Sequence, residues 1–166
     1  GLRGLKYGIT KNYVQGLEVV LANGDVLHTG GKNVKDVSGY DMTKLFTGSE
    51  GTLGIVTKAL LKLVPAPEKT KSMVAIFDTI EDAGRAVSGI IAAKIIPATL
   101  EILDNATIRT VEDFMHVGLP TDADAILLIE VDGHPVVVED EADKVMKVLE
   151  ENNAREVTLA RDAKHK

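Results

Sequence analysis

The chain has 166 residues, a formal net charge of −6 and 45% apolar residues, which is enough apolar material for a buried core. Its acidic balance and an aromatic content of only 4%, without tryptophan, argue against a nucleic-acid partner. The chain contains no cysteine, so it has no disulfide bond or thiolate metal site, and no apolar run approaches the roughly 18 residues of a membrane span. These features are typical of a cytoplasmic protein.

Charge divides the chain into two parts that meet near two prolines. Residues 1–71 hold ten Lys and Arg against six Asp and Glu, whereas the remainder is strongly acidic. Pro65 and Pro67 stand at this change, and proline cannot donate a hydrogen bond to a sheet. We therefore expect two domains, residues 1–67 and residues 68–166.

The first part begins with a hairpin signal. Apolar and polar residues alternate from residue 14, and Asn23-Gly24 supplies the turn before the chain returns to residue 29. His28 is interpreted as a strand residue with one face toward water. A short helix is expected at residues 41–46, with Asp41 as its N-cap.

A glycine-rich run follows at residues 48–54, where Gly48, Gly51 and Gly54 recur at every third position. It leads into an apolar, β-branched segment that predicts a buried strand continuing to Val64. Such a turn can present backbone N–H groups to a diphosphate. The residues alone equally allow a tight turn with a bulge and no ligand.

The second part alternates between strand and helix signals. Strands are expected at residues 72–77, 98–103, 125–131 and 155–160, and helices at 80–93, 104–114 and 135–152. Thr79 and Asp104 are predicted N-caps, and Pro135 opens the last helix. The order predicts a ferredoxin-like antiparallel sheet covered by helices on one side. The fold class is therefore α+β.

Four ordered blocks, residues 6–10, 16–24, 39–45 and 48–54, together resemble the second half of the FAD-binding domain (PCMH type) of the vanillyl-alcohol oxidase superfamily. Residues 97–104 are similar to the start of that superfamily's substrate (cap) domain. Within the superfamily, the chain is similar to the branch of glycolate oxidase FAD subunits and D-lactate dehydrogenases. The resemblance covers nearly the whole chain.

The resemblance implies FAD as the cofactor and assigns a cofactor-binding role to nine positions. These are Glu50, Gly51, Thr52, Leu53, Gly54, Ile55, Val56, Tyr7 and Gly8. We expect the backbone at Gly51 and Gly54 to approach the cofactor and Leu53 and Ile55 to shield it from water. Glu50 has two interpretations: it binds a ribose hydroxyl, or it satisfies backbone donors of its own turn.

The resemblance also implies oxidation of a small D-2-hydroxy acid, such as glycolate or D-lactate, with electrons passing to partner subunits or another acceptor. Hydride removal from such an acid needs a base for the hydroxyl proton and cations for the carboxylate. Relatives place these groups after the last strand expected here, so no catalytic or metal-binding residue is assigned within the chain. We expect an internal piece of a longer enzyme, inactive by itself. We expect the enzyme to be cytoplasmic or, through partner subunits, peripheral at the inner membrane. A homo-oligomer is compatible with the resemblance.

An alternative from another class remains open at this point. The ferredoxin-like half could be a small-molecule-sensing or assembly module without a catalytic role. Flavin absorbance of the full-length protein distinguishes the two, because only the first interpretation requires a bound yellow cofactor.

Overall fold

The computed structural model describes residues 1–160, which form two compact units. One unit is Gly8–Pro65. The other consists of Gly1–Tyr7 together with the chain from Ala66 onward. The first seven residues therefore belong with the second part of the sequence.

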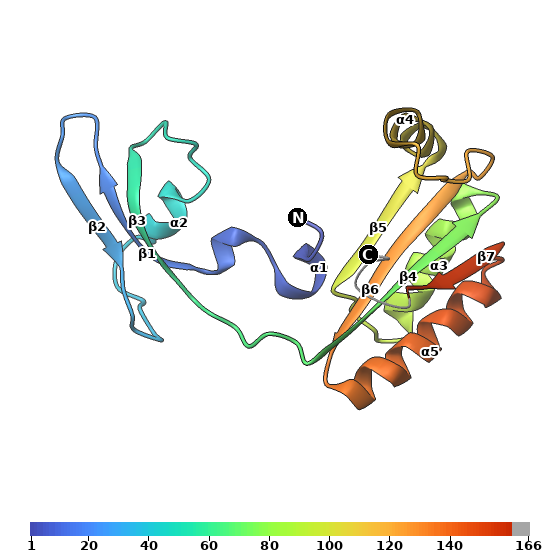
Figure 1. The fold of residues 1–166 in the computed structure, drawn as a ribbon. Coiled ribbons are helices and arrows are strands. Elements are labelled where there is room, and N and C mark those ends of the chain that lie inside the picture. Colours follow the sequence, from blue (N-terminus) through green and yellow to red (C-terminus); the bar gives the residue numbers. More distant parts are fainter. Residues whose placement is uncertain (161–166) are drawn as a thin grey trace. The chain divides into compact units, whose positions relative to one another are not determined.

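The smaller unit is built on a three-stranded antiparallel sheet in the order β2-β1-β3 (Figure 1). Its strands are β1 (Val14–Val20), β2 (Val26–Gly30) and β3 (Ile55–Leu61). β1 and β2 form the hairpin that the sequence predicts, with Gly24 at a φ of 89° in the turn. A left-handed φ of this kind favours glycine, which explains the Asn-Gly pair.

Two short helical segments, η1 (Thr10–Asn12) and α2 (Met42–Phe46), complete this unit. The carboxylate of Asp41 accepts the Lys44 amide at 2.9 Å, so the predicted N-cap of α2 is confirmed. Phe46 of α2 packs with apolar residues of β1 in a small core. The core comprises Val14, Leu17, Val19 and Phe46.

The expectation of a buried strand from residue 55 to Val64 is wrong. β3 ends at Leu61 and lies at the edge of the sheet, where every residue but Leu60 is exposed. Ile55 as a whole residue is 62% exposed. A β-branched, apolar sequence favours a strand. It does not determine whether other residues of this chain bury that strand.

The larger unit contains an antiparallel sheet in the order β5-β6-β4-β7 (Figure 1). In chain order its elements are α1 (Gly4–Tyr7), β4 (Lys69–Phe77), α3 (Ile80–Ala92), β5 (Thr99–Asp104), α4 (Asn105–Met115), β6 (Ala125–Gly133), α5 (Pro135–Glu151) and β7 (Glu156–Leu159). α3 and α5 lie together on one face of the sheet. This arrangement is the α+β sandwich that the sequence predicts.

The main core lies between this sheet and its two helices. Along β6, alternate residues Ala125, Leu127, Ile129 and Val131 are buried in it, as the period of a strand requires. The predicted caps are also confirmed: the Asp82 amide binds the Thr79 hydroxyl at 3.2 Å, and the Thr107 amide binds the Asp104 carboxylate at 2.8 Å. The helix α1 contacts β5 and buries none of its own residues.

Candidate functional site

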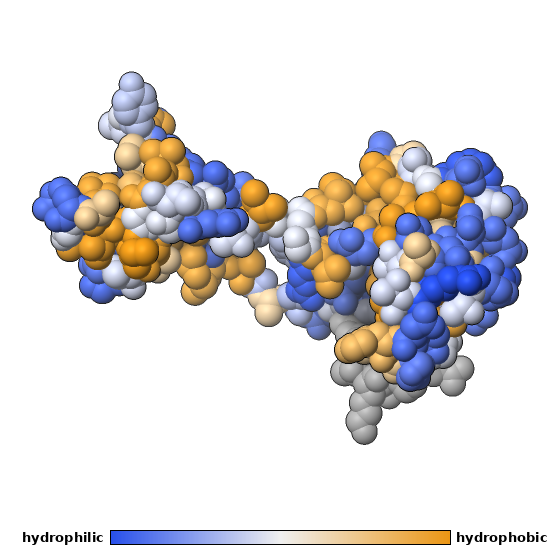
Figure 2. Space-filling view, turned by 90° about the horizontal axis from the view of Figure 1, so that it is seen from above, coloured by the Kyte–Doolittle hydropathy of each residue, from blue (hydrophilic) through white to orange (hydrophobic). Residues whose placement is uncertain are grey.

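A groove of about 500 Å³ lies in the smaller unit beside the glycine-rich corner, residues 48–54. Its walls include Val14 and Leu17 of β1, Phe46 of α2 and Ile55 of β3. The surface of the groove is mostly apolar, and hydrophobic residues reach the outside of this unit in the space-filling view (Figure 2). An apolar hollow with a few polar groups is typical of small-molecule sites.

The corner beside the groove has an unusual backbone. φ is 89° at Gly48, 52° at Glu50 and 78° at Gly51. Among the hydrogen bonds of the described residues, none uses the Gly51 amide. A β-carbon at Gly51 would find only Cδ1 of Ile55 within 4 Å, at 3.9 Å. The backbone at Gly51 is therefore open to an incoming group.

Two predicted site residues, Thr52 and Leu53, lie outside the lining of the groove. The amide of Thr52 binds the Ser49 carbonyl at 3.0 Å, and its hydroxyl binds the same oxygen at 2.6 Å. Both groups therefore stabilise the corner itself. Leu53 as a whole residue is 46% exposed.

Glu50 lines the groove together with Gly51, Gly54, Ile55 and Val56. The residue is exposed, and its carboxylate accepts no hydrogen bond within the described part of the chain. The interpretation that Glu50 satisfies donors of its own turn is therefore wrong. A bond to a ribose hydroxyl stays a prediction.

Gly54 has a structural reason of its own. A β-carbon at this position would lie 2.6 Å from Cγ1 of Val19 and 2.9 Å from the carbonyl oxygen of Val20. Glycine is thus required here by the close approach of the chain to β1, whatever binds in the groove.

Tyr7 and Gly8 do not line the groove. The hydroxyl of Tyr7 donates to the carboxylate of Asp132 on β6 at 2.7 Å, and the Lys6 ammonium donates to the same carboxylate at 2.6 Å. Burial acts to raise the pKa of Asp132, but the bonds from Lys6 and Tyr7, with the charge of Lys6, hold it below its ordinary value. The Tyr7 hydroxyl is therefore committed to Asp132.

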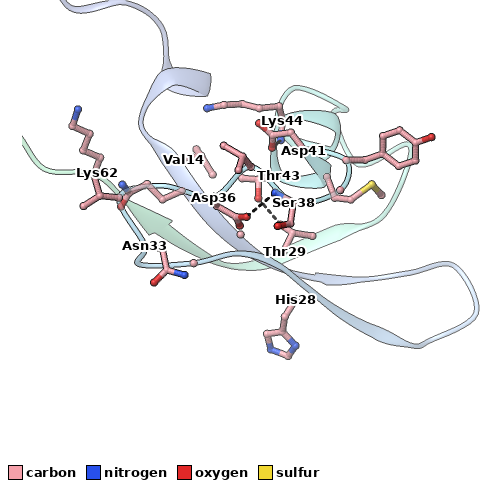
Figure 3. A pocket seen from close by; sticks show the side chains of 18 of the residues that line it. Val14, His28, Thr29, Asn33, Asp36, Ser38, Asp41, Thr43, Lys44 and Lys62 are labelled. Atoms are coloured by element: carbon pink, nitrogen blue, oxygen red, sulfur yellow. Dashed lines mark hydrogen bonds between the residues drawn. The ribbon is translucent and has the colours of Figure 1, made fainter.

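A second hollow of about 500 Å³ lies beside β2, α2 and the loop between them (Figure 3). It is polar, but the hydroxyls of Thr29 and Thr43 bind each other at 2.9 Å, and Asp41 caps α2. We assign these groups to the fold. His28 points away from them in Figure 3 and binds Glu18 at 3.1 Å, which confirms it as an exposed strand residue.

The sequence did not identify several residues of the groove or the partner of Tyr7. The sequence pattern predicts Val14, Leu17 and Phe46 only as parts of a hairpin and a helix. Asp132 lies near the end of β6, in a mostly apolar stretch, and its carboxylate is buried. A charged residue within a largely hydrophobic strand is the available signal, because a buried carboxylate needs partners.

Among the described residues, no group of three or more His, Cys, Asp or Glu side chains is arranged to hold a metal ion. Within residues 1–160, no helix is long and apolar enough to cross a membrane.

Sequence similarity shows the family to which the chain belongs. Residues 66–166 match the family described as "FAD linked oxidases, C-terminal domain". The chain belongs to the FAD-linked oxidases. The matched region starts where the larger unit resumes after Pro65, so this family accounts for the sheet β5-β6-β4-β7 and its helices.

Relatives of this FAD-linked oxidase chain extend the similarity to residues before 66. The chain is 58% identical to the glycolate oxidase subunit GlcD of Bacillus subtilis over 96% of its length, covering 34% of that protein. The identity to GlcD of Escherichia coli K12 is 44%, over 98% of the chain and 32% of that protein. A D-lactate dehydrogenase of Archaeoglobus fulgidus is 36% identical, over 96% of the chain and 35% of the relative. The chain thus spans about a third of the length of these relatives.

Solved structures share the fold at lower identity. An alkyldihydroxyacetonephosphate synthase aligns with a TM-score of 0.73 at 20% identity, over 98% of the chain and 32% of its own. p-Cresol methylhydroxylase aligns with a TM-score of 0.59 at 22% identity, over 89% of the chain and 34% of its own. Both alignments extend over the two compact units.

Proposed function

We propose that the chain is part of an FAD-dependent enzyme that oxidises a D-2-hydroxy acid of the glycolate or D-lactate type. The observation that carries this proposal is the 58% identity to a glycolate oxidase subunit across 96% of the chain. The relatives called D-lactate dehydrogenases point to the same substrate chemistry. In this proposal residues 1–67 are part of the FAD-binding domain and residues 68–166 part of the C-terminal substrate domain.

The apolar groove is the proposed place where this chain contacts the cofactor. Its lining includes Glu50, Gly51, Gly54, Ile55 and Val56, five of the nine positions that the family resemblance assigns. The exposed apolar wall would exclude water, and the free amide of Gly51 would donate a hydrogen bond. Bound FAD would supply the acceptor for the hydride removed from the substrate.

The other four assigned positions would act less directly. Thr52 would keep the corner in shape through its two bonds to the Ser49 carbonyl. Leu53, 46% exposed, would cover the outside of the corner. Tyr7 and Gly8 would act through the backbone that leads into the smaller unit, since the Tyr7 hydroxyl is bound to Asp132.

The proposal also covers partners and location. Because two relatives are named as subunits, we propose that the whole protein works with electron-transfer partners and can form homo-oligomers. A cytoplasmic location, or one at the inner membrane through those partners, agrees with this role.

The experiment uses the full-length protein. We expect it to purify with a yellow flavin whose visible absorbance bleaches when glycolate or D-lactate is added without oxygen, and not with L-lactate. A purified protein that stays colourless after incubation with FAD would refute the proposal. If the protein binds a flavin that no 2-hydroxy acid reduces, the proposed cofactor stands, but the proposed substrate class is refuted.

A matched pair of variants tests the groove. Ile55 lines it at one edge of the sheet, and Val26, 56% exposed, lies on the other edge strand outside it. We expect Ile55→Lys to weaken FAD binding by roughly 10-fold or more, because it places a charge on an apolar wall, and Val26→Lys to leave the affinity unchanged. Equal affinities in the two variants would place the cofactor elsewhere.

A further inference from the structure

The first seven residues of the chain pack on the sheet of the larger unit, to which they themselves belong. Asp132 and Glu130 alternate along β6 with the core residues beneath α3 and α5, so their side chains stand on the opposite, open face of the sheet. Both carboxylates bind the first residues of the chain. The helix α1 also contacts the edge strand β5 (Figure 1). The segment therefore covers part of the face that α3 and α5 leave open.

The inner contact of this segment is made by the carboxylate of Asp132. The Lys6 ammonium and the Tyr7 hydroxyl donate to its two oxygens at 2.6 and 2.7 Å. Lys6 donates a further bond to the main-chain carbonyl of Asp132. The side chain of Asp132 is 0% exposed, so this contact lies away from water.

The outer contact is made by Glu130, two residues earlier on β6. Its carboxylate accepts a bond from Arg3 at 3.0 Å and one from the hydroxyl of Ser72, its neighbour on β4, at 3.0 Å. The side chain of Arg3 is 54% exposed. The outer contact is therefore open to the solvent on its Arg3 side.

Polar contacts dominate the attachment of this segment. The helix α1 has only four residues and buries none of them. Leu2 and Leu5 are 62% and 51% exposed, so they contribute little apolar burial. Within the described residues, the bonds to Asp132 and Glu130 are therefore the main hold on residues 3–7.

Salt should affect the two contacts differently. Dissolved ions screen the attraction between exposed charges strongly and that between buried charges much less. The pair of Arg3 and Glu130 is the more exposed one, and the pair of Lys6 and Asp132 the more buried one. A rise in ionic strength should therefore release Arg3 before Lys6.

We propose that residues 3–7 form a strap on the open face of the sheet, held closed by charged and polar bonds and able to open while the sheet stays folded. Opening begins at Arg3 and proceeds toward Tyr7, and it uncovers the carboxylates of Glu130 and Asp132. Segments with few buried apolar contacts are the ones that open locally in folded proteins. The strap is a conformational device of the larger unit alone and does not rest on the proposed function.

Limited digestion of the full-length protein with trypsin tests the strap, because trypsin cleaves after lysine and arginine. Arg3 and Lys6 are cleavage sites within the strap, and Lys94, an exposed lysine directly after the C-cap of α3, is a control site in the same unit. Cleavage reports the population of the open form when closing is faster than cutting. Mass spectrometry measures the rate at each site at about 0.05 M and about 0.5 M salt.

Two variants change the inner contact. Asp132→Asn keeps the size of the side chain and removes its charge, and Tyr7→Phe removes a single hydroxyl. Asp140→Asn is the matched control, since Asp140 is an exposed carboxylate that binds Lys144 at 2.6 Å on α5. The circular dichroism spectrum shows whether each variant is folded.

We expect Asp132→Asn to speed cleavage after Lys6 roughly 10-fold, because bonds to charged groups are the stronger ones. Tyr7→Phe should speed it roughly 3-fold, and Asp140→Asn should match the parent. In the parent, the higher salt concentration should speed cleavage after Arg3 roughly 3-fold, the range of an exposed ion pair, and cleavage after Lys6 by less. The rate after Lys94 should stay the same throughout.

Two results would overturn the inference. One is an unchanged rate after Lys6 in folded Asp132→Asn. The other is a rate after Lys94 that rises in step with the rates in the strap, because that would mean unfolding of the whole unit. If Asp132→Asn does not fold, Tyr7→Phe decides by the same two comparisons.

Discussion

A β-carbon at Gly54 would lie 2.6 Å from Cγ1 of Val19. Val19 is fully buried in the small core of the three-stranded unit, so it has little room to yield. The glycine that ends the corner therefore fixes how closely β3 approaches β1. The glycine-rich corner, residues 48–54, also borders the groove, and its position next to β1 depends on this close approach.

We expect Gly54→Ala to destabilise the protein by about 1–3 kcal/mol, the usual cost of forcing extra volume into a packed site. The measurement is the urea midpoint followed by circular dichroism. Gly84→Ala is the control, because Gly84 lies in α3 with nothing within 4 Å of its position for a β-carbon. That change should stabilise the helix by about 0.5–1 kcal/mol. Equal effects in the two variants would contradict the packing argument.

Glu18 on β1 should make stability depend on acid pH. The Lys58 ammonium and the Thr57 hydroxyl, each 2.8 Å from its carboxylate, lower the pKa of Glu18 from 4.5 to about 2. The folded form holds the Glu18 proton less tightly than the unfolded form, so the ionised carboxylate adds to the free energy of unfolding. This contribution is complete above pH 4.5 and is lost as the pH falls toward 2.

The variant that checks this is Glu18→Gln, with the unfolding midpoint measured at about pH 5 and about pH 3. The parent should lose more stability between these two values than the variant does. Glu81→Gln, which changes an exposed carboxylate of α3, should behave as the parent. Identical pH dependence in the parent and Glu18→Gln would show that the cluster around Glu18 does not act on stability.

Thr79 should stabilise α3 through its position at the N-terminus. Its hydroxyl accepts the Asp82 amide at 3.2 Å and donates to the Asp82 carboxylate at 2.7 Å. Thr79→Ala should cost about 1 kcal/mol, a typical value for a lost N-cap. Ser88→Ala removes a hydroxyl in the middle of the same helix and should be neutral or slightly stabilising. A chemical unfolding curve for each variant measures the difference, and a neutral Thr79→Ala would refute the capping role.

The caps and the hairpin could be predicted from the sequence because their physics is local. Asp41, Thr79 and Asp104 bind amides only three residues away, and Asn23-Gly24 forms its turn from adjacent residues. The order of strands and helices in the larger unit follows from periodicity in the same way. These features need no knowledge of distant parts of the chain.

Contacts between distant residues were not predictable in this way. Lys6 and Asp132 are 126 positions apart, so no pattern within a short window could assign residues 1–7 to the larger unit. The exposure of β3 was missed for a related reason. Ile55 and Val56 have the composition of a buried strand, but composition does not show which surface covers them.

Adjacent residues of β6 provide the last prediction. Leu127 is fully buried beneath the helices α3 and α5, whereas Leu128 points to the other face and is 36% exposed. Leu127→Ala should cost about 2–5 kcal/mol, because it removes apolar contacts and leaves a cavity that the packed core cannot close. Leu128→Ala should cost roughly 1 kcal/mol, since part of its surface already contacts water. Thermal and urea unfolding of both variants measure this contrast. Similar losses of stability in the two variants would contradict this argument, because they would mean that the face of the sheet that carries Leu128 is packed as tightly as the core.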